Sequence, residues 1–203
     1  EEPTESDTGI EPATTPASPA TEEEPQPSEV QGRTNLLQAP HAHRLTAPWK
    51  TKGEGSIEKD PGEENNYYFT IRYSGMIWQD VPIKNSDGKY VLLIAWASSE
   101  RVNPDGDQTG LPYIYGEMSH QDDQNRITAH LSGEQMMLRP SLADEWGVIY
   151  GIFQVPAQTG GLRFFMEQAD GHEPQSGSAA RFDRPGVFLF DSKTQVEEFV
   201  KDY

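Results

Sequence analysis

The aromatic residues are confined to one part of the chain. All 20 Phe, Tyr and Trp residues lie at or beyond Trp49, whereas the first 48 residues carry eight prolines and nine acidic residues. A segment rich in Glu, Pro, Thr, Ser and Ala has little apolar surface to bury against the entropy cost of ordering. The sequence therefore predicts a disordered acidic tether over residues 1–48 and one folded domain over residues 49–203.

The charge balance and the absence of cysteine exclude several functions. The chain has a formal net charge of −17 and no cysteine. Binding to nucleic acid or to an anionic lipid surface needs clustered Lys and Arg, which the chain lacks. Without cysteine there is no disulfide, thiolate metal site or cysteine nucleophile. The longest apolar run, residues 91–97, is far shorter than the ~20 residues of a membrane-spanning helix, so we expect membrane attachment only through an upstream anchor.

The composition of the tether also indicates where in the cell the protein is located. A Glu/Pro/Thr-rich spacer ahead of an acidic β-rich domain is typical of bacterial envelope proteins, in which a lipid-anchored terminus must clear the surface. The chain begins at Glu1 without methionine, which we interpret as a processed or trimmed form. We therefore expect an extracytoplasmic location, in the cell envelope, periplasm or cell surface. A disordered flank of a cytoplasmic protein is the alternative.

Period-two alternation of apolar and polar residues dominates the chain beyond residue 51 and predicts half-buried strands. In the run from Tyr67, Tyr67, Phe69 and Ile71 alternate with polar residues. A second strand is predicted over 76–83, and the turn residues 85–88 should join it to the next run as a hairpin or corner. The run over 90–97 is apolar at every position, which favours a central strand covered on both faces.

Further strands and one helix complete the prediction. Strands are expected at 112–118, 126–131, 134–139, 147–155, 162–168 and 187–190, with 147–155 paired to 162–168. Ser192 followed by Gln195 indicates a capping box at the start of a C-terminal helix. The predicted fold class is all-β and mainly antiparallel: a β-sandwich, immunoglobulin-like or related, with a C-terminal helix and a disordered N-terminal tether.

Two stretches of the sequence resemble strands of a known domain family. Residues 145–165 read EWGVIYGIFQVPAQTGGLRFF, and residues 87–96 read DGKYVLLIAW. The first resembles the C-terminal strands of telokin-like immunoglobulin-fold domains, and the second is similar to their central strand. Such domains occur on bacterial surface lipoproteins, often after a low-complexity tether. The resemblance implies an immunoglobulin-like fold.

One loop has the composition of a cation site. Residues 103–110 read NPDGDQTG and place side-chain oxygens at alternate positions: Asn103, Asp105, Asp107 and Thr109. Ca²⁺ takes about six to eight oxygen ligands, and a turn rich in Asp and Gly can supply several of them. The spacing departs from an EF-hand, since Gln108 stands where glycine is needed. Calcium is therefore the one cofactor that the sequence suggests, and a solvated loop is the alternative.

Aromatic side chains suggest a ligand surface. The four tryptophans and eight tyrosines exceed what a small sandwich core needs. Trp78 stands opposite Ile77 and Val81 in its strand, and Trp146 is flanked by acids and glycine, so both are predicted to be exposed and to bind ligand. Exposed rings stack on sugars, which makes a carbohydrate-binding module with a calcium-supported loop one hypothesis.

Catalytic motifs are absent from the sequence. The histidines are scattered, and no serine lies in a nucleophile motif. Paired acids at 122–123 and 144–145 leave a hydrolase open as a second alternative. The main interpretation is a non-catalytic binding or accessory domain of an exported, lipid-anchored envelope protein. A protein or carbohydrate partner would meet an edge strand or a loop face.

Overall fold

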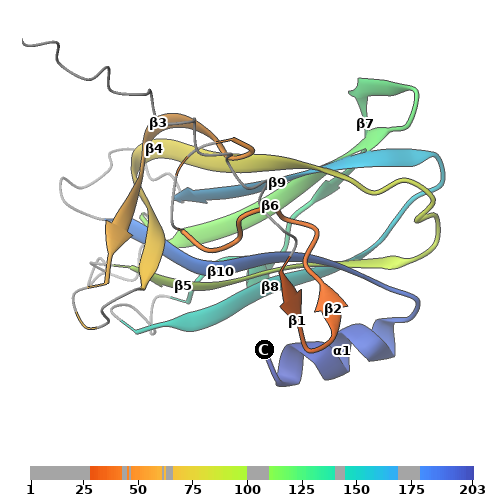
Figure 1. Ribbon diagram of the computed structural model, residues 1–203. Coiled ribbons are helices and arrows are strands. Elements are labelled where there is room, and N and C mark those ends of the chain that lie inside the picture. Colours follow the sequence, from red (N-terminus) through yellow and green to blue (C-terminus); the bar gives the residue numbers. More distant parts are fainter. Residues whose placement is uncertain are drawn as a thin grey trace, which may run out of the picture.

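The described part of the chain is built almost entirely from antiparallel strands (Figure 1). The computed structural model describes residues 28–42, 45, 47–60, 62, 66–99, 110–139, 145–168 and 179–203. The elements are β1 (Glu29–Val30), β2 (Arg33–Thr34), β3 (Lys50–Lys59), β4 (Tyr67–Pro82), β5 (Tyr90–Ser99), β6 (Pro112–His120), β7 (Asp123–Leu131), a 3₁₀ turn η1 (Glu134–Met136), β8 (Gly147–Gln154), β9 (Thr159–Gln168), β10 (Ala179–Phe190) and α1 (Lys193–Lys201).

A single long strand joins the two layers of the sandwich. The hydrogen-bonded order is β7-β6-β9-β4-β10-β5-β8, and β3 pairs with β4. Residues 76–82 of β4 pair with β9, whereas residues 69–72 pair with β10. Between them Tyr73 has a φ of 53°, and Figure 1 shows β4 curving from one layer into the other. One layer is therefore β7-β6-β9-β4, the other is β4-β10-β5-β8, and the predicted β-sandwich is confirmed.

The β10-β5-β8 layer buries both of its faces. Val91, Leu93 and Ala95 of β5 face the core between the layers, and the intervening Leu92 and Ile94 face a second apolar cluster beneath α1. Each of these five side chains is fully buried. The prediction that this apolar run is a central strand covered on both faces is confirmed, because alternate residues of a strand point to opposite faces.

The helix α1 covers that second cluster. The Ser192 hydroxyl accepts a hydrogen bond from the Gln195 backbone N–H at 3.4 Å, and the Gln195 side chain accepts one from the Asp191 N–H at 3.2 Å. These contacts satisfy free N–H groups at the start of the helix. Val196 and Phe199 are buried against β10 and β5, so the predicted amphipathic C-terminal helix is confirmed.

The predicted tether boundary at residue 48 is wrong for residues 28–42, because these residues fold against the sandwich. Strand β4 pairs with the first residues of β10 and then turns away to pair with β9. The rest of that edge of β10 is not paired with β4, and the segment that follows β2 forms hydrogen bonds to it instead. Asn35 is buried, donates to the Pro185 carbonyl at 3.0 Å and accepts from the Val187 N–H at 3.0 Å. Leu37 is fully buried in the core. The rest of the tether prediction falls on residues 1–27, which lie outside the described residues.

Three other predictions are corrected by the strand pairing. Residues 134–139 form the η1 turn and an isolated bridge at Met137 rather than a strand. Strand β8 pairs with β5, and β9 pairs with β4 and β6, so these two consecutive strands are not partners. The strands predicted from Tyr67 and over 76–83 are one strand, β4, whose second half pairs with β9 in the layer opposite β5. The connection through residues 85–88 is therefore the corner alternative and not the hairpin. Among the described residues, no helix has the length and apolar character needed to span a membrane.

Candidate functional site

In the described part of the chain, no helix covers one face of the layer formed by β6, β9 and the second half of β4. Its inner face carries core residues, including Ile77 of β4, Phe164 of β9 and Ile114 of β6. The alternate residues therefore point outward. We call this surface the outer face, and it consists of the outward residues of β4 (76, 78, 80 and 82), β9 (161, 163, 165 and 167) and β6 (113, 115, 117 and 119).

An aromatic row crosses the outer face. The register places Trp78 beside Phe165 and Phe165 beside Tyr115. The ring centroids of Tyr115 and Phe165 are 4.3 Å apart with an interplanar angle of 4°, and Trp78 lies 6.3 Å from Phe165 at 30°. Tyr113 continues the row at 5.6 Å from Tyr115. Phe165, whose ring lies between its neighbours, is only 7% exposed, whereas Trp78 at one end of the aromatic row and Tyr115 and Tyr113 at the other are partly exposed.

The tyrosines of the aromatic row are held in place by their hydroxyl groups. The Tyr115 hydroxyl donates to Glu167 Oε1 at 2.8 Å. Burial, followed by this bond and the charge of Glu167, raises the pKa of Tyr115 well above its usual range. Burial likewise raises the pKa of Tyr113, although a hydrogen bond with Ser132 opposes the shift. Both hydroxyls therefore stay protonated near neutral pH and remain hydrogen-bond donors.

Three charged side chains lie side by side on the same strands, two residues beyond the aromatic row, and we call them the charged rung. Asp80 of β4 lies beside Arg163 of β9, which in turn lies beside Glu117 of β6. Asp80 Oδ1 accepts from Arg163 Nε and Oδ2 from Lys50 Nζ, each at 2.6 Å. Partial burial raises the pKa of Asp80, but the hydrogen bonds and charges of Arg163 and Lys50 outweigh it and hold that pKa below 3.8. Asp80 is therefore an ionised acceptor that fixes two cationic side chains.

Replacing Asp80 with asparagine should remove an acid-sensitive contribution to stability. Because the folded-state pKa lies below the unfolded value of 3.8, the carboxylate stabilises the fold above that value, and this stabilisation disappears as the pH falls through the folded pKa. The partners are about half exposed, so the loss at neutral pH should be no more than about 1 kcal/mol. Urea unfolding of both proteins from pH 2.5 to 7 should show a constant difference above about pH 5 that shrinks below 3.8. An equal difference at every pH would contradict this role.

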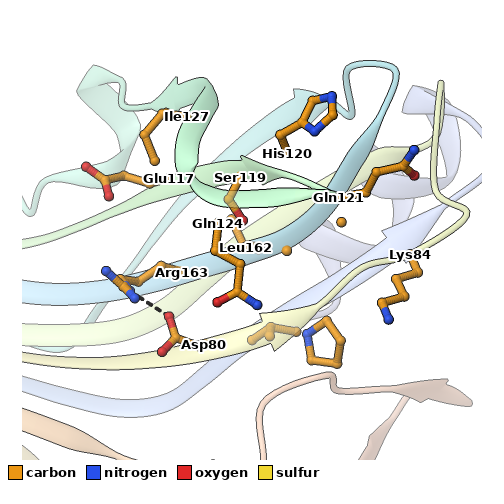
Figure 2. Close-up of a pocket in the computed structure, with 14 residues that line it drawn as sticks. Asp80, Lys84, Glu117, Ser119, His120, Gln121, Gln124, Ile127, Leu162 and Arg163 are labelled. Atoms are coloured by element: carbon orange, nitrogen blue, oxygen red, sulfur yellow. Dashed lines mark hydrogen bonds and ion pairs between the residues drawn. The ribbon is translucent and has the colours of Figure 1, made fainter.

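A cavity of about 380 Å³ opens beyond the charged rung. Its floor is formed by the ends of β4, β6 and β9, and Figure 2 shows the Arg163–Asp80 pair with Ile127 on one side and Lys84 on the other. Its lining residues are Asp80, Val81, Pro82, Lys84, Glu117, Ser119, His120, Gln121, Gln124, Ile127, Gly160, Gly161, Leu162 and Arg163. This volume is within the ~300–1,000 Å³ range of small-ligand sites.

A β-bulge places Ile127 at the cavity. Met118 pairs with Ala129, but Ser119 pairs with Ile127, so one extra residue, Thr128, interrupts the register. An extra residue reverses which face the following side chains point to. Ala129 and Leu131 therefore pack on the core side, as alternation predicts, whereas Ile127 turns to the outer face and is 37% exposed. Strict alternation over residues 127–131 would place Ile127 on the same face as Leu131, and the bulge is the reason that it does not lie there.

His120 lines the cavity but already has partners. Its Nδ1 accepts from the Asp122 backbone N–H at 3.2 Å, and its Nε2 lies 3.1 Å from Gln158 Oε1. These contacts suit a neutral ring that donates through Nε2. The described residues contain no group of three or more His, Asp or Glu side chains arranged to hold a metal. The predicted calcium loop, Asn103 to Thr109, lies outside the described residues.

The two tryptophans singled out from the sequence lie on different surfaces. Trp78 is half-buried in the aromatic row. Trp146 is 37% exposed just before β8 and meets Tyr68 edge-on at a centroid distance of 5.8 Å. The acid pairs are likewise separate: residues 122–123 lie at the β6–β7 turn, Glu145 precedes β8, and Asp144 is outside the described residues.

Sequence reasoning missed the partners of Trp78. Phe165, Tyr115 and Arg163 were all within predicted strands, and alternation with Leu162 and Ile114 was enough to place them opposite the core. The missing information was the strand order, since β4 and β9 are separated by more than 70 residues in the sequence and pair only in the fold.

Comparisons with known proteins identify the fold and no family. No protein-family model matches the chain, and no curated protein matches it in sequence. Among solved structures, the enzymatically active domain of tailspike protein 4 from bacteriophage CBA120 aligns with a TM-score of 0.51 and 11% identity, over 77% of this chain and 21% of that one. The arabinose-bound α-L-arabinofuranosidase MgGH51 aligns with a TM-score of 0.51 and 14% identity, over 76% of this chain and 26% of that one.

A third solved structure contains binding modules. The N-terminal CBM22-1–CBM22-2 tandem domain of Paenibacillus barcinonensis Xyn10C aligns with a TM-score of 0.50 and 16% identity, covering 71% of this chain and 46% of that one. This chain thus spans between about a fifth and a half of the length of the three proteins. At such low identities the likeness shows the β-sandwich fold alone, and the resemblance to telokin-like domains stays a prediction.

Proposed function

We propose that this chain is a non-catalytic carbohydrate-binding module that holds its glycan on the outer face of β4, β9 and β6. The observation that carries the proposal is that the aromatic row continues into a polar cavity on the outer face. Sugar rings have apolar C–H faces and a rim of hydroxyl groups, so a site for them needs both kinds of surface.

The residues on the outer face match these two requirements. Trp78 is at the accessible end of the aromatic row, where its indole offers apolar surface to a sugar ring. Two residues farther along the strand, Asp80 supplies fixed acceptor oxygens, and Arg163 retains donors besides the Nε–H that binds Asp80. This donor and acceptor pair is suited to adjacent sugar hydroxyls.

The matched folds give secondary support. The tandem domain of Xyn10C consists of CBM22 carbohydrate-binding modules, and the arabinofuranosidase is a glycan-active enzyme bound to arabinose. A β-sandwich supports many unrelated functions, so this similarity adds to the argument from the site and does not replace it.

The lowered pKa of Asp80 argues against one catalytic role, that of the general acid of a glycosidase. A glycosidase needs a carboxylic acid kept protonated by a raised pKa to protonate the leaving group. Asp80 has the opposite shift and is engaged with two cations. Export and lipid anchoring at the cell envelope remain a proposal from the sequence, which cell fractionation would test. The calcium-supported loop of the carbohydrate-binding module is a separate proposal, which melting curves in Ca²⁺ and in chelator would test.

Affinity electrophoresis would test the carbohydrate proposal. Native gels would contain xylan, mixed-linkage β-glucan, galactan or laminarin, which are neutral, or polygalacturonate or alginate, which are anionic. We expect at least one polysaccharide to retard the chain, with no release of reducing sugar on long incubation. If no polysaccharide retards it, the carbohydrate proposal is wrong and a protein partner is favoured. Sugar release would instead favour the hydrolase.

A further inference from the structure

The aromatic row and the cavity lie in line on the outer face. Trp78, Asp80 and Pro82 are successive outward residues of β4, and the cavity begins at Asp80. At about 3.3 Å per residue, Trp78 and Pro82 are separated by roughly 13 Å along the strand. A ligand that contacts both ends therefore has to be longer than a single sugar ring.

Two glycines keep the cavity floor open. Gly161 occupies the outward position between Pro82 and Ser119, and a Cβ there would come within 2.9 Å of Ser119 Oγ. A Cβ on Gly160 would come within 2.5 Å of the Gln121 Cα. Side chains at these positions would fill the space, so the cavity depends on glycine at the start of β9.

Ile127 gives this polar cavity an apolar side. It is one of the few large apolar residues exposed in the described part of the chain, and the Thr128 bulge directs it to the cavity. An exposed isoleucine gains from covering the apolar face of a ligand. Pro82 also lines the cavity, so apolar contacts are available from β4 as well as from β7.

The ionic residues of the cavity favour an uncharged ligand. Its four ionic lining residues are two acids and two bases: Asp80, Glu117, Lys84 and Arg163. Arg163 is already paired with Asp80, and the whole chain carries a net charge of −17. An anionic polysaccharide would therefore meet no net local attraction and would be repelled at long range.

We infer that the cavity is a second sugar subsite, and that the ligand is a neutral oligosaccharide that runs along the strands from Trp78 to Ile127. This inference rests on the proposed carbohydrate function and adds the ligand's charge, its minimum length and the residue that contacts its far end. Ile127 is then a specificity residue of the site.

The length dependence of binding tests the subsite. Isothermal titration of the full chain would use the mono- to hexasaccharides of the neutral polysaccharide that binds best. We expect the affinity to rise by at least about 10-fold between the monosaccharide and the tri- or tetrasaccharide, since the longer ligand reaches the cavity. An affinity that does not change with length would overturn the subsite while leaving the carbohydrate function intact.

Variants separate the subsite from the aromatic row. Ile127→Ser should weaken binding of the tetrasaccharide by at least about 5-fold and leave monosaccharide binding unchanged, and Gly161→Ala should have the same effect by filling the floor. Ile127 is partly exposed, so the protein should fold normally. Trp146→Ala, an equally exposed apolar residue on another surface, is the matched control. Unchanged tetrasaccharide binding by both cavity variants would overturn the inference.

Salt dependence tests the charge assignment. Binding of the neutral tetrasaccharide should be the same in 50 and 500 mM NaCl, because no ion pair with the ligand is screened. Polygalacturonate should not bind at either concentration. Tighter binding of polygalacturonate than of every neutral polysaccharide would overturn the inference and leave the general carbohydrate proposal in place. Failure of every polysaccharide in the gels would overturn both.

Discussion

Replacing Trp78 with alanine should lower the affinity for a neutral oligosaccharide by at least about 10-fold, which corresponds to about 1.4 kcal/mol. Trp78 is the accessible end of the aromatic row, and the next ring, Phe165, is almost covered by its neighbours. Tryptophan is among the residues that most often contribute a large share of the free energy of a binding surface. Isothermal titration and the change in tryptophan emission would measure the effect.

The matched control for Trp78 is Trp146, which also lies outside the core but on a different surface. Trp146→Ala should bind the oligosaccharide with the affinity of the unmodified chain. If Trp146→Ala loses binding and Trp78→Ala retains it, the glycan site would have to be moved to the end of the sandwich near Tyr68. Melting curves of both variants would show that neither change unfolds the protein.

Removing the segment that precedes Trp49 should strongly destabilise the domain. A chain that begins at Trp49 loses Leu37 from the core and leaves Val187 of β10 without its hydrogen bonds to Asn35 and Leu36. Loss of a buried leucine costs about 2–5 kcal/mol, and unsatisfied buried polar groups cost about 1–3 kcal/mol each. We therefore expect a loss of at least about 3 kcal/mol, measured by urea unfolding.

A chain that begins at Ser28 is the control for this truncation, since it retains every contact described for residues 28–42. The variant Leu37→Ala in the full chain should lose roughly 2–5 kcal/mol. Equal stability of the chains beginning at Ser28 and at Trp49 would show that residues 28–48 are a tether, as the composition alone suggests.

The alternation of apolar and polar residues located strands well, because it directly reflects which side chains are buried in the core. Residues 67–82 are one strand whose core face carries Phe69, Ile71 and Ile77. The run that becomes β5 is apolar throughout, because a layer and α1 cover its two faces. The C-terminal helix was predicted from its cap, since the Ser192 hydrogen bond is local in sequence.

The elements that the sequence did not reveal depend on distant partners. Strand β3 reads KTKGEGSIEK and is largely exposed, so it has no apolar alternation, yet it pairs along β4. The segment at Asn35 has only two neighbouring leucines among polar residues and no alternation, and it is ordered by the open edge of β10. The region after Gly133 alternates like a strand but is anchored by Met136 as a 3₁₀ turn.

The candidate site was predictable only in part for the same reason. The position of Trp78 opposite Ile77 placed its ring on the outer face. Its stacking partners required the pairing of β4 with β9 and of β9 with β6, which no local pattern encodes. The exposure of Ile127 required the bulge at Thr128, since a single extra residue reverses the direction of the side chains that follow it.

Titration of the ¹⁵N-labelled chain with the neutral oligosaccharide that binds best would test the site most directly. The chain has four tryptophans and hence four indole N–H resonances. We expect the Trp78 indole and the backbone amides of residues 78–81, 115–119 and 161–165 to shift on binding, and the Trp146 indole not to shift. Shifts confined to Trp146 and its surroundings, with the outer face unchanged at saturation, would contradict it.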